Sequence, residues 1–391
     1  MQPRNIFFNI ILAQLFSLLL QGFFGKTMNY SFIDVYTYGC VARYAPTDKK
    51  QATNIEFLQK SRIMKKISLL LFMAAIILIG GSCKRTSSFG SVKSDNFSNG
   101  KAGEIILVLD SSKWTAAQID ELHQFFNQPQ PAINQIEPMF DILTFSNRDF
   151  TAYFQRHRNI IRFDINPDYA ANHFQIIENN WSSPQIYAYF KGNNADTCMA
   201  LFRANDSLIM QRFYENDLKR SQTYFARIQE ESISKLIKSK FNIQLTEPNH
   251  YLVAADYEDF LWLRFRTEKN DRFIMIYRTP ATELTQENLI AARNEMTQKY
   301  VPGAVKGAYP IVAEKLGFPI VKPLSKGNKD GMEMRGLWES VNDKMGGPFY
   351  SFTFPSADGQ YNITVDGFVY APQEPKRDYL REVEAIVKTV R

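Results

Sequence analysis

The chain has 391 residues, of which 45% are hydrophobic, and its formal net charge is +6. Residues 1–82 hold nine Lys or Arg and three Asp or Glu, so the totals of 46 and 40 fall to 37 basic and 37 acidic residues from Cys83 onward. This balance removes the electrostatic argument for a nucleic-acid partner, and we expect no nucleic acid to bind.

The first 63 residues precede a second potential start at Met64. Their apolar stretch, Ile6–Phe24, is long enough to cross a bilayer, but one asparagine and two glutamines interrupt it. Amide side chains are unfavourable inside hydrocarbon when they have no partners. We therefore interpret residues 1–63 as an upstream extension in front of the true start, with a membrane-inserted N-terminus as the alternative.

Residues 64–82 have the order of a secretory signal peptide. Two lysines precede the 13-residue run Ile67–Ile79, and small residues lead from there to Cys83. A cysteine in this place is typical of the lipobox of bacterial lipoproteins, although Gly80 stands where Leu, Val or Ile is usual. Since 13 residues are too few to span a bilayer comfortably, a buried core helix is the alternative. The pattern predicts lipid attachment at Cys83.

Residues 83–102 are rich in Ser, Lys, Asn and Gly, which predicts a flexible tether. Lys84 and Arg85 follow the cysteine directly, whereas surface-exported lipoproteins of this kind tend to carry acidic residues there. We therefore expect a lipid anchor that faces the periplasm, most simply in the outer membrane of a bacterial cell envelope.

Strand and helix patterns alternate through the first half of the remaining chain. Alternation and apolar runs predict strands over 103–110, 140–145, 159–165 and 185–190. Thr115 and Gln118 have the spacing of a capping box and predict the start of a helix. Asp110-Ser111-Ser112 could suggest a metal-binding motif, but a turn that leads into this cap is the better interpretation. Helical spacing predicts one long helix from about 206 to 240.

The second half has a similar style. Strands are predicted over 241–246, 250–257, 259–266 and 271–278, followed by a helix over 285–300 that ends at Pro302-Gly303. The end of the chain predicts a hairpin around Ser356–Gly359 and a final amphipathic helix with five apolar residues on one face. These five residues are Leu380, Val383, Ile386, Val387 and Val390.

The sum predicts an α+β fold with mostly antiparallel sheets and amphipathic helices on one face. The globular region would cover 103–391, and two subdomains, 103–240 and 241–391, are an option. In each part a strand pattern is followed some twenty residues later by a strand with Arg-Phe, as in FDILTF and NIIRFDI. This short correspondence leaves two similar halves open as a hypothesis.

Known catalytic and metal-binding signatures are missing from the sequence: there is no G-x-S-x-G, H-E-x-x-H, P-loop or G-x-G-x-x-G motif. The four histidines, His123, His157, His173 and His250, have no metal-ligand spacing. Cys198 is the lone cysteine after Cys83 and is expected to be a small core residue. We therefore expect no metal ion, cofactor or identified catalytic residue.

Two stretches are candidate binding surfaces. Alternation on the strand 259–266 places Trp262, Arg264 and Arg266 on one face, where they could hold a sugar, a carboxylate or an acidic loop. A solvated face with cation–π packing is the plainer alternative. The second candidate combines Arg335 and Trp338 with Gly346 and Gly347, for which a structural turn is the alternative.

Several segments together resemble a family. The lipobox leader, GEIILVLD, RNIIRFDINP (158–167), WSSPQ (181–185), RGLWESVNDKMGGPF (335–349) and DGFVYAPQEPKRDYLREVEAIVKTV (366–390) are similar to an uncharacterised lipoprotein family of Bacteroidota-type bacteria, known only as a domain of unknown function. The resemblance covers residues 64–391 and leaves 1–63 outside. It implies an envelope address and supplies no catalytic residues.

The expected function is therefore a lipid-anchored cell-envelope protein that acts as a binding or scaffolding module facing the periplasm. Its expected partners are the membrane, through lipidated Cys83, and an envelope protein or a glycan. The alternative is an envelope hydrolase without a motif, and a deep pocket with His157, Arg158 or Asp164 would favour it. A subunit of a larger complex would instead show a continuous exposed apolar patch.

Overall fold

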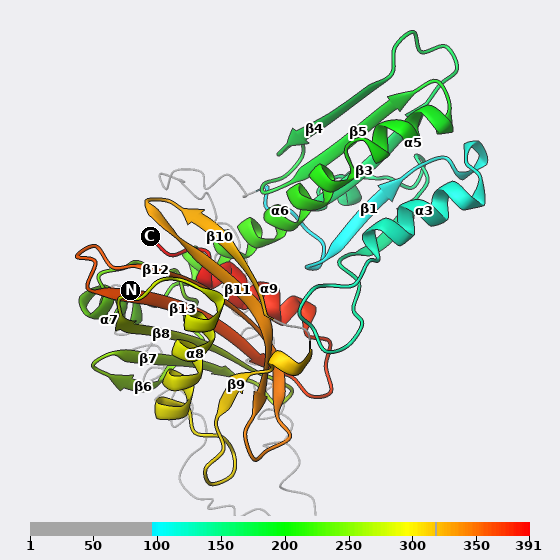
Figure 1. Ribbon diagram of the computed structural model, residues 1–391. Coiled ribbons are helices and arrows are strands. Elements are labelled where there is room, and N and C mark those ends of the chain that lie inside the picture. Colours follow the sequence, from blue (N-terminus) through cyan, green and yellow to red (C-terminus); the bar gives the residue numbers. More distant parts are fainter. Residues whose placement is uncertain (1–95, 317–318) are drawn as a thin grey trace, which may run out of the picture. The chain divides into compact units, whose positions relative to one another are not determined.

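The computed structural model describes residues 96–316 and 319–391 (Figure 1). The predicted extension, the signal peptide and Cys83 lie outside these residues. Residues Ser91–Arg391 form a compact unit of their own. In the described part of this unit, four buried clusters of apolar side chains form the core.

The smaller of two sheets has the strand order β2-β1-β3-β5-β4, and three of its four pairings are parallel. Its strands are β1 (Glu104–Val108), β2 (Asp141–Phe145), β3 (Asn159–Ile165), β4 (His173–Glu178) and β5 (Ile186–Gly192). The helices α3 (Ala116–Phe126) and α5 (Ala195–Arg203) pack on one face of this sheet, where Phe163, Phe190 and Phe202 meet. A short helix, α4 (Ala152–Gln155), precedes β3.

Local signals at the start of α3 are confirmed. Thr115 accepts a hydrogen bond from the backbone of Gln118, and the Gln118 side chain accepts one from the backbone of Thr115, so the capping box is complete. Asp110 caps a 3₁₀ turn, η1 (Ser111–Lys113), by accepting hydrogen bonds from Ser112, which confirms the turn interpretation. Cys198 is fully buried among the aromatic residues, as expected.

The predicted helix over 206–240 consists of two helices, α6 (Asp206–Arg227) and α7 (Glu231–Phe241). Glu230 is the N-cap of α7, because its carboxylate accepts a hydrogen bond from the Ser232 backbone. The first half of α6 packs in the core of the smaller sheet, whereas its second half and α7 pack in the core of the larger one. A boundary between two parts of the chain therefore falls between α6 and α7, earlier than residue 240.

The larger sheet is antiparallel throughout, with the order β10-β11-β12-β13-β8-β7-β6 and with β9 paired to β11. Its strands are β6 (Leu252–Tyr257), β7 (Phe260–Arg266), β8 (Asp271–Pro280), β9 (Pro310–Val312), β10 (Ile320–Lys326), β11 (Lys329–Ser340), β12 (Gly346–Pro355) and β13 (Tyr361–Tyr370). A second 3₁₀ turn, η2 (Glu314–Leu316), lies between β9 and β10.

Helices cover both faces of the larger sheet (Figure 1). The final helix, α9 (Arg377–Val387), packs on one face, and all five of its predicted apolar residues are fully buried there. The helix α8 (Gln286–Tyr300) packs on the other. This arrangement differs from the expectation of helices on one face. Successive residues of a strand point to opposite faces, and along β8 and β13 the residues on both faces include apolar ones, so both faces need a cover.

The α+β class is confirmed, and antiparallel pairings predominate over the described residues as a whole. Two similar halves are excluded, because one sheet is mostly parallel and the other antiparallel. The stretch 241–246, on which the comparison of halves partly rested, forms no strand. The hairpin around Ser356–Gly359 is confirmed, with Gly359 at a φ of 69°.

The end of the predicted tether also needs correction. Residues 97–102 lie against the folded part: Phe97 pairs with Ser183, Asn99 pairs with His157, and the Ser98 side chain is 1% exposed. The Arg220 guanidinium donates hydrogen bonds to the Ser98 backbone oxygen at 2.8 and 3.1 Å. The packed chain therefore begins before Gly103.

Polar side chains join α6 and α9 to the smaller sheet, and we call this set the junction. Buried Asp217 accepts hydrogen bonds from the Gly103 backbone at 2.7 Å, from Arg381 at 3.2 Å and from Arg158 at 3.4 Å. Glu137 accepts hydrogen bonds from the first backbone N–H groups of α9, where Lys376, the N-cap residue, makes no side-chain cap. Charged groups thus hold the two parts together within this unit.

Candidate functional site

The first predicted surface lies on β7. Alternation is confirmed, because Leu261 and Leu263 are fully buried on one face while Trp262 lies on the other, 5.6 Å from the Phe273 ring. Arg264 donates a hydrogen bond to Asp271 at 2.7 Å, and the more exposed Arg266 lies 3.8 Å from the same carboxylate. None of these side chains lines any of the four hollows described below.

The second predicted surface is divided by β11. Arg335 faces α9 and lies 2.6 Å from the Glu384 carboxylate, whereas Trp338 is 3% exposed in the opposite core and donates a hydrogen bond to the Val369 oxygen at 3.0 Å. Residues three positions apart on a strand point to opposite faces, so these two cannot contact one ligand as expected.

Trp338, Gly346 and Gly347 do lie together. They line part of a hollow of about 380 Å³, which also has Asp343 and Lys344 on its wall. Gly347 has a structural reason to be glycine, because an added Cβ would lie 2.1 Å from the Val369 oxygen. The glycine pair therefore begins a strand instead of forming a turn, and its role in binding stays a prediction.

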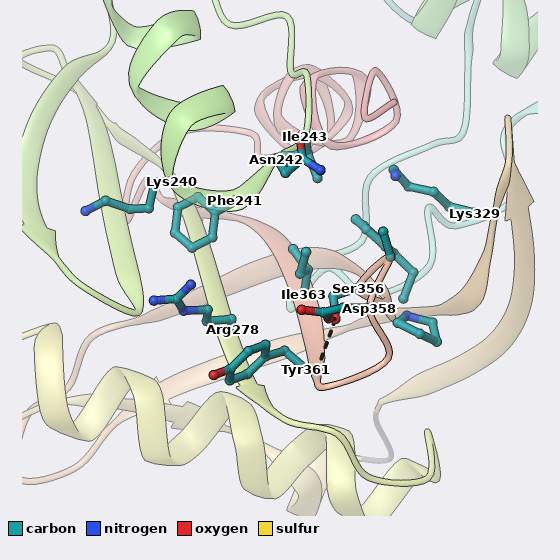
Figure 2. A pocket seen from close by; sticks show the side chains of 13 residues that line it. Lys240, Phe241, Asn242, Ile243, Arg278, Lys329, Ser356, Asp358, Tyr361 and Ile363 are labelled. Atoms are coloured by element: carbon teal, nitrogen blue, oxygen red, sulfur yellow. Dashed lines mark hydrogen bonds between the residues drawn. The ribbon is translucent and has the colours of Figure 1, made fainter.

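Another hollow, of about 260 Å³, lies between the end of α7 and the β12–β13 hairpin (Figure 2). Apolar side chains of Phe241 and Ile363 form part of its wall, and Arg278 and Lys329 lie on different sides of it in Figure 2. The Asp358 carboxylate accepts a hydrogen bond from the Ser356 hydroxyl at 2.6 Å, which lowers the pKa of Asp358.

The cations of this hollow already have partners. The Lys240 ammonium contacts the Asp256 carboxylate and donates a hydrogen bond to the Tyr257 oxygen at 2.6 Å. Burial, and then the neighbouring Arg278, lower the pKa of Lys240. The Arg278 guanidinium lies 5.3 Å from the centre of the Tyr361 ring and 3.4 Å from Glu258. The hollow is therefore amphipathic, with its positive charge partly neutralised.

The strongest charge asymmetry lies in a larger hollow of about 520 Å³, which we call the basic groove. Its wall consists of Lys219, Gln222, Thr223, Ala226, Arg227, Thr246, Lys326, Lys388, Thr389 and Arg391. Five of these side chains are cationic, and none is a carboxylate.

Three elements build the basic groove. The α6 residues recur three or four positions apart from Lys219 to Arg227, so they share one helical face. Lys326 ends β10, and Lys388 and Arg391 follow α9. Two contacts fix the ends: the Thr246 backbone donates to the Thr389 hydroxyl at 2.8 Å, and Gln244 and Arg391 exchange backbone hydrogen bonds at 3.0 Å.

The cations of the basic groove differ in their partners. Lys388 lies 2.9 Å from Glu384 and 3.8 Å from Glu333, and the Arg227 guanidinium lies 4.8 Å from the centre of the Phe97 ring. Within 96–316 and 319–391, no carboxylate lies within ion-pair distance of Lys219 or Lys326. Unneutralised positive charge therefore remains at the groove.

A second hollow of about 350 Å³ adjoins the basic groove and shares Thr246, Thr389 and Arg391 with it. It adds Lys235 and Lys238, with Glu231 as its acidic side chain, 2.8 Å from Lys235. Both hollows together extend the positive surface from α6 to α7.

A buried acid lies behind this second hollow. Glu247 is fully buried, and one of its oxygens accepts a hydrogen bond from Ser234, which lines the hollow, at 2.7 Å. Its other oxygen has no hydrogen-bond partner among the described residues. Burial raises the pKa of Glu247 to about 7, so the carboxyl group is partly protonated at neutral pH.

The three residues proposed for a hydrolase do not share a site. His157 is buried, its Nδ1 lies 3.1 Å from the Asn159 oxygen, and burial lowers its pKa. Arg158 belongs to the junction, and Asp164 accepts hydrogen bonds from Tyr169 and Tyr189. None of the three side chains lines any of the four hollows described above.

The described part of the chain lacks two further features. Groups of three or more His, Cys, Asp or Glu residues that could hold a metal ion are not found there. Helices of sufficient length and apolar character to cross a membrane are likewise not found there.

Fold and surface together define a class: an α+β protein with two joined parts and open polar hollows on its surface. Two family models match these parts separately, a domain of unknown function (DUF8532) over residues 98–226 and another (DUF4837) over residues 230–389. The predicted similarity to a domain of unknown function is thus confirmed, and the two matches meet between α6 and α7. No activity is attached to either match.

Comparisons with individual proteins add little. No curated protein matches the chain. Among solved structures, the lipid transfer and protein localization domain of human StarD13 (DLC2) is 10% identical, with a TM-score of 0.17 over 41% of this chain and 94% of that one. A likeness at this level carries no argument about function.

Sequence reasoning missed the basic groove. The neutral balance of residues 83–391 hid it, because an average says nothing about where charges gather in space. A useful signal was present: Lys219, Gln222, Thr223 and Arg227 form a polar face whose charges are all positive. The β10 and α9 contributions are distant in sequence and had no such signal.

Proposed function

We propose that the chain is a lipid-anchored binding module of the bacterial cell envelope and that the basic groove binds an anionic ligand. One observation carries the proposal: five cationic side chains and no acidic side chain line one open hollow. Cations gathered on one surface attract phosphate or carboxylate groups and raise their local concentration.

The address of this module rests on the leader sequence. A signal peptide over 64–82 and lipidation of Cys83 would anchor the chain to a membrane, and Lys84 and Arg85 favour a periplasm-facing position. Anionic groups are available there on lipid headgroups and on phosphorylated or acidic glycans. A glycan or protein partner therefore fits the groove only if it is acidic.

The hydrolase alternative has no comparable support. Its three candidate residues are separated, and two of them, His157 and Arg158, are buried in hydrogen bonds of the folded chain. General acid–base catalysis needs such groups within reach of one substrate. The separation of these residues therefore favours the binding module over the hydrolase.

Calorimetric titration of the Ser91–Arg391 unit with inorganic tripolyphosphate tests the proposal. The double variant Lys219→Gln/Lys326→Gln removes two unpaired charges from the groove and should weaken binding at least about tenfold. Lys306→Gln/Lys315→Gln removes two exposed charges elsewhere and serves as the matched control, expected within about twofold of wild type.

Salt dependence provides a second readout. Binding should weaken steeply as salt is raised, because exposed charges are screened beyond about 8 to 10 Å at physiological ionic strength. Absence of binding at low salt, or equal loss in both double variants, would show that the groove is not an anion site.

A further inference from the structure

The first packed residues of the chain lie beside the basic groove. The Phe97 ring lies 4.5 Å from the Arg220 guanidinium and 4.8 Å from that of Arg227, which lines the groove. Ser98 is buried and is held by Arg220. The polypeptide that comes from Cys83 therefore reaches the folded part next to the groove.

Chain length limits how far the groove can lie from the anchor. Phe97 is fourteen positions after Cys83, and each position can extend the chain by at most about 3.6 Å, which gives a span of about 50 Å. If Cys83 is lipidated, the groove stays within this distance of the membrane surface. Attachment beside the groove, instead of at a remote face, lets that surface approach the cations.

The exposure of the groove also suits a surface more than a small soluble molecule. Lys219, Arg227 and Arg391 are exposed, whereas small-molecule sites enclose most of their ligand. Lys326 and Lys329 flank the tip of the β10–β11 hairpin, where Gly327 has a φ of 62°. Lys326 lines the basic groove and Lys329 the hollow of Figure 2, so the tip adds positive charge on both sides.

We infer that the basic groove is a second membrane contact, which docks onto the phosphate groups of anionic lipids in the membrane that holds the Cys83 anchor. The inference rests on the proposed function and specifies its ligand. A lipid chain combined with a polybasic surface binds anionic membranes more firmly than either signal alone. Docking would fix the orientation of the module and place the junction and the Figure 2 hollow at a defined height above the bilayer.

Vesicle sedimentation of the Ser91–Arg391 unit, which lacks the anchor, tests this. Vesicles of phosphatidylcholine alone are compared with vesicles in which about one third of the lipid is phosphatidylglycerol. We expect binding only to the anionic vesicles. Each cation near such a surface contributes about fivefold, so Lys219→Gln/Lys326→Gln should lower the partition coefficient about 25-fold. The control Lys306→Gln/Lys315→Gln should stay within about twofold of wild type.

The tripolyphosphate and vesicle experiments together distinguish failure of membrane docking from failure of the anion site. Binding of tripolyphosphate without binding to anionic vesicles would overturn membrane docking and leave the anion site intact. No binding to either would overturn both. Vesicle binding that both double variants lose equally would also overturn docking through the groove. Free glycerol phosphate is added as a competitor: if it displaces the protein at concentrations close to that of the vesicle lipid, the ligand is a soluble phosphate compound and membrane docking fails.

Discussion

The junction and the basic groove both contain cations on or next to the helices α6 and α9, but these cations have different partners. In the junction, Arg381 and Arg158 lie against the buried Asp217 carboxylate; between β11 and α9, outside the junction, Arg335 likewise lies against buried Glu384. In the groove, exposed Lys219 and half-buried Lys326 have no such partners among the described residues. The comparison shows that the position of the carboxylates, more than the number of cations, distinguishes structural charge from charge available to a ligand.

Two neighbouring residues of α6 illustrate the point. Asp217 is 3% exposed and has four hydrogen-bond donors around it, whereas Lys219, two positions later, is exposed and lines the groove. Two positions along a helix turn the side chain to a different face. One helix therefore carries a buried anion of the junction and an exposed cation of the basic groove.

The largest expected effect comes from breaking the junction. Replacing Asp217 by Ala leaves Arg158 and Arg381 buried without their carboxylate, and loss of one member of a buried ionic network costs about 3 to 5 kcal/mol. Urea unfolding followed by circular dichroism should show this loss in the Ser91–Arg391 unit.

The matched control is Glu215→Ala, which removes an exposed carboxylate from the same helix and should change the free energy of unfolding by less than about 0.5 kcal/mol. Equal effects of the two substitutions would mean that the junction does not hold the parts together.

A second, smaller effect separates carboxylates that have a cation partner from one that has none. Glu384 is fully buried; burial alone would raise its pKa, but Arg335 and Lys388 lower it to about 2. Among the described residues no cation forms an ion pair with Glu247, and burial raises the pKa of Glu247 to about 7. Paired Glu384 thus stabilises the fold when ionised, whereas Glu247 stabilises it best when protonated.

Glu247→Gln tests this difference through pH. The ordinary carboxyl pKa of 4.5 applies to the unfolded chain, so between pH 4.5 and 7 the unfolded state releases the proton first and the free energy of unfolding falls. The total fall is about 3 kcal/mol and is complete above pH 7. In the Gln variant this fall should disappear, so the difference between the two proteins should grow with pH over that range and then stay constant.

Glu384 changes stability with pH in the opposite direction to Glu247: its contribution is lost as the pH falls. Its pKa in the folded state lies below that in the unfolded state, so its contribution is present above pH 4.5 and is lost as pH falls toward 2.

A pH-independent difference between wild type and Glu247→Gln would show that Glu247 is not buried as described.

Local signals predicted much of the fold and little of the site. The capping box of α3, the β12–β13 hairpin and the apolar face of α9 each depend on residues close in sequence, and all were found. The parallel pairing of strands in the smaller sheet depends on long connections between them. The break between α6 and α7 depends on which hydrophobic core each helix packs against. The basic groove needed α6, β10 and the end of α9 side by side, which no local pattern records.

The smallest expected effect on stability comes from the groove itself, and it is the sharpest test of the comparison. Lys219 is exposed and Lys326 is half-buried, and no carboxylate of the described chain lies within ion-pair distance of either, so Lys219→Gln/Lys326→Gln breaks no ion pair there. The free energy of unfolding should change by less than about 0.5 kcal/mol, and the sign should be a gain, because like charges that share a hollow repel one another.

Salt distinguishes relief of repulsion from a neutral substitution. Added sodium chloride screens the groove cations and should raise the unfolding midpoint of wild type more than that of the double variant. The same two residues would then weaken stability slightly while providing most of the affinity for anions, which is the relation expected of side chains kept for a ligand. A clear loss of stability in the double variant would place Lys219 and Lys326 with the structural charges of the junction.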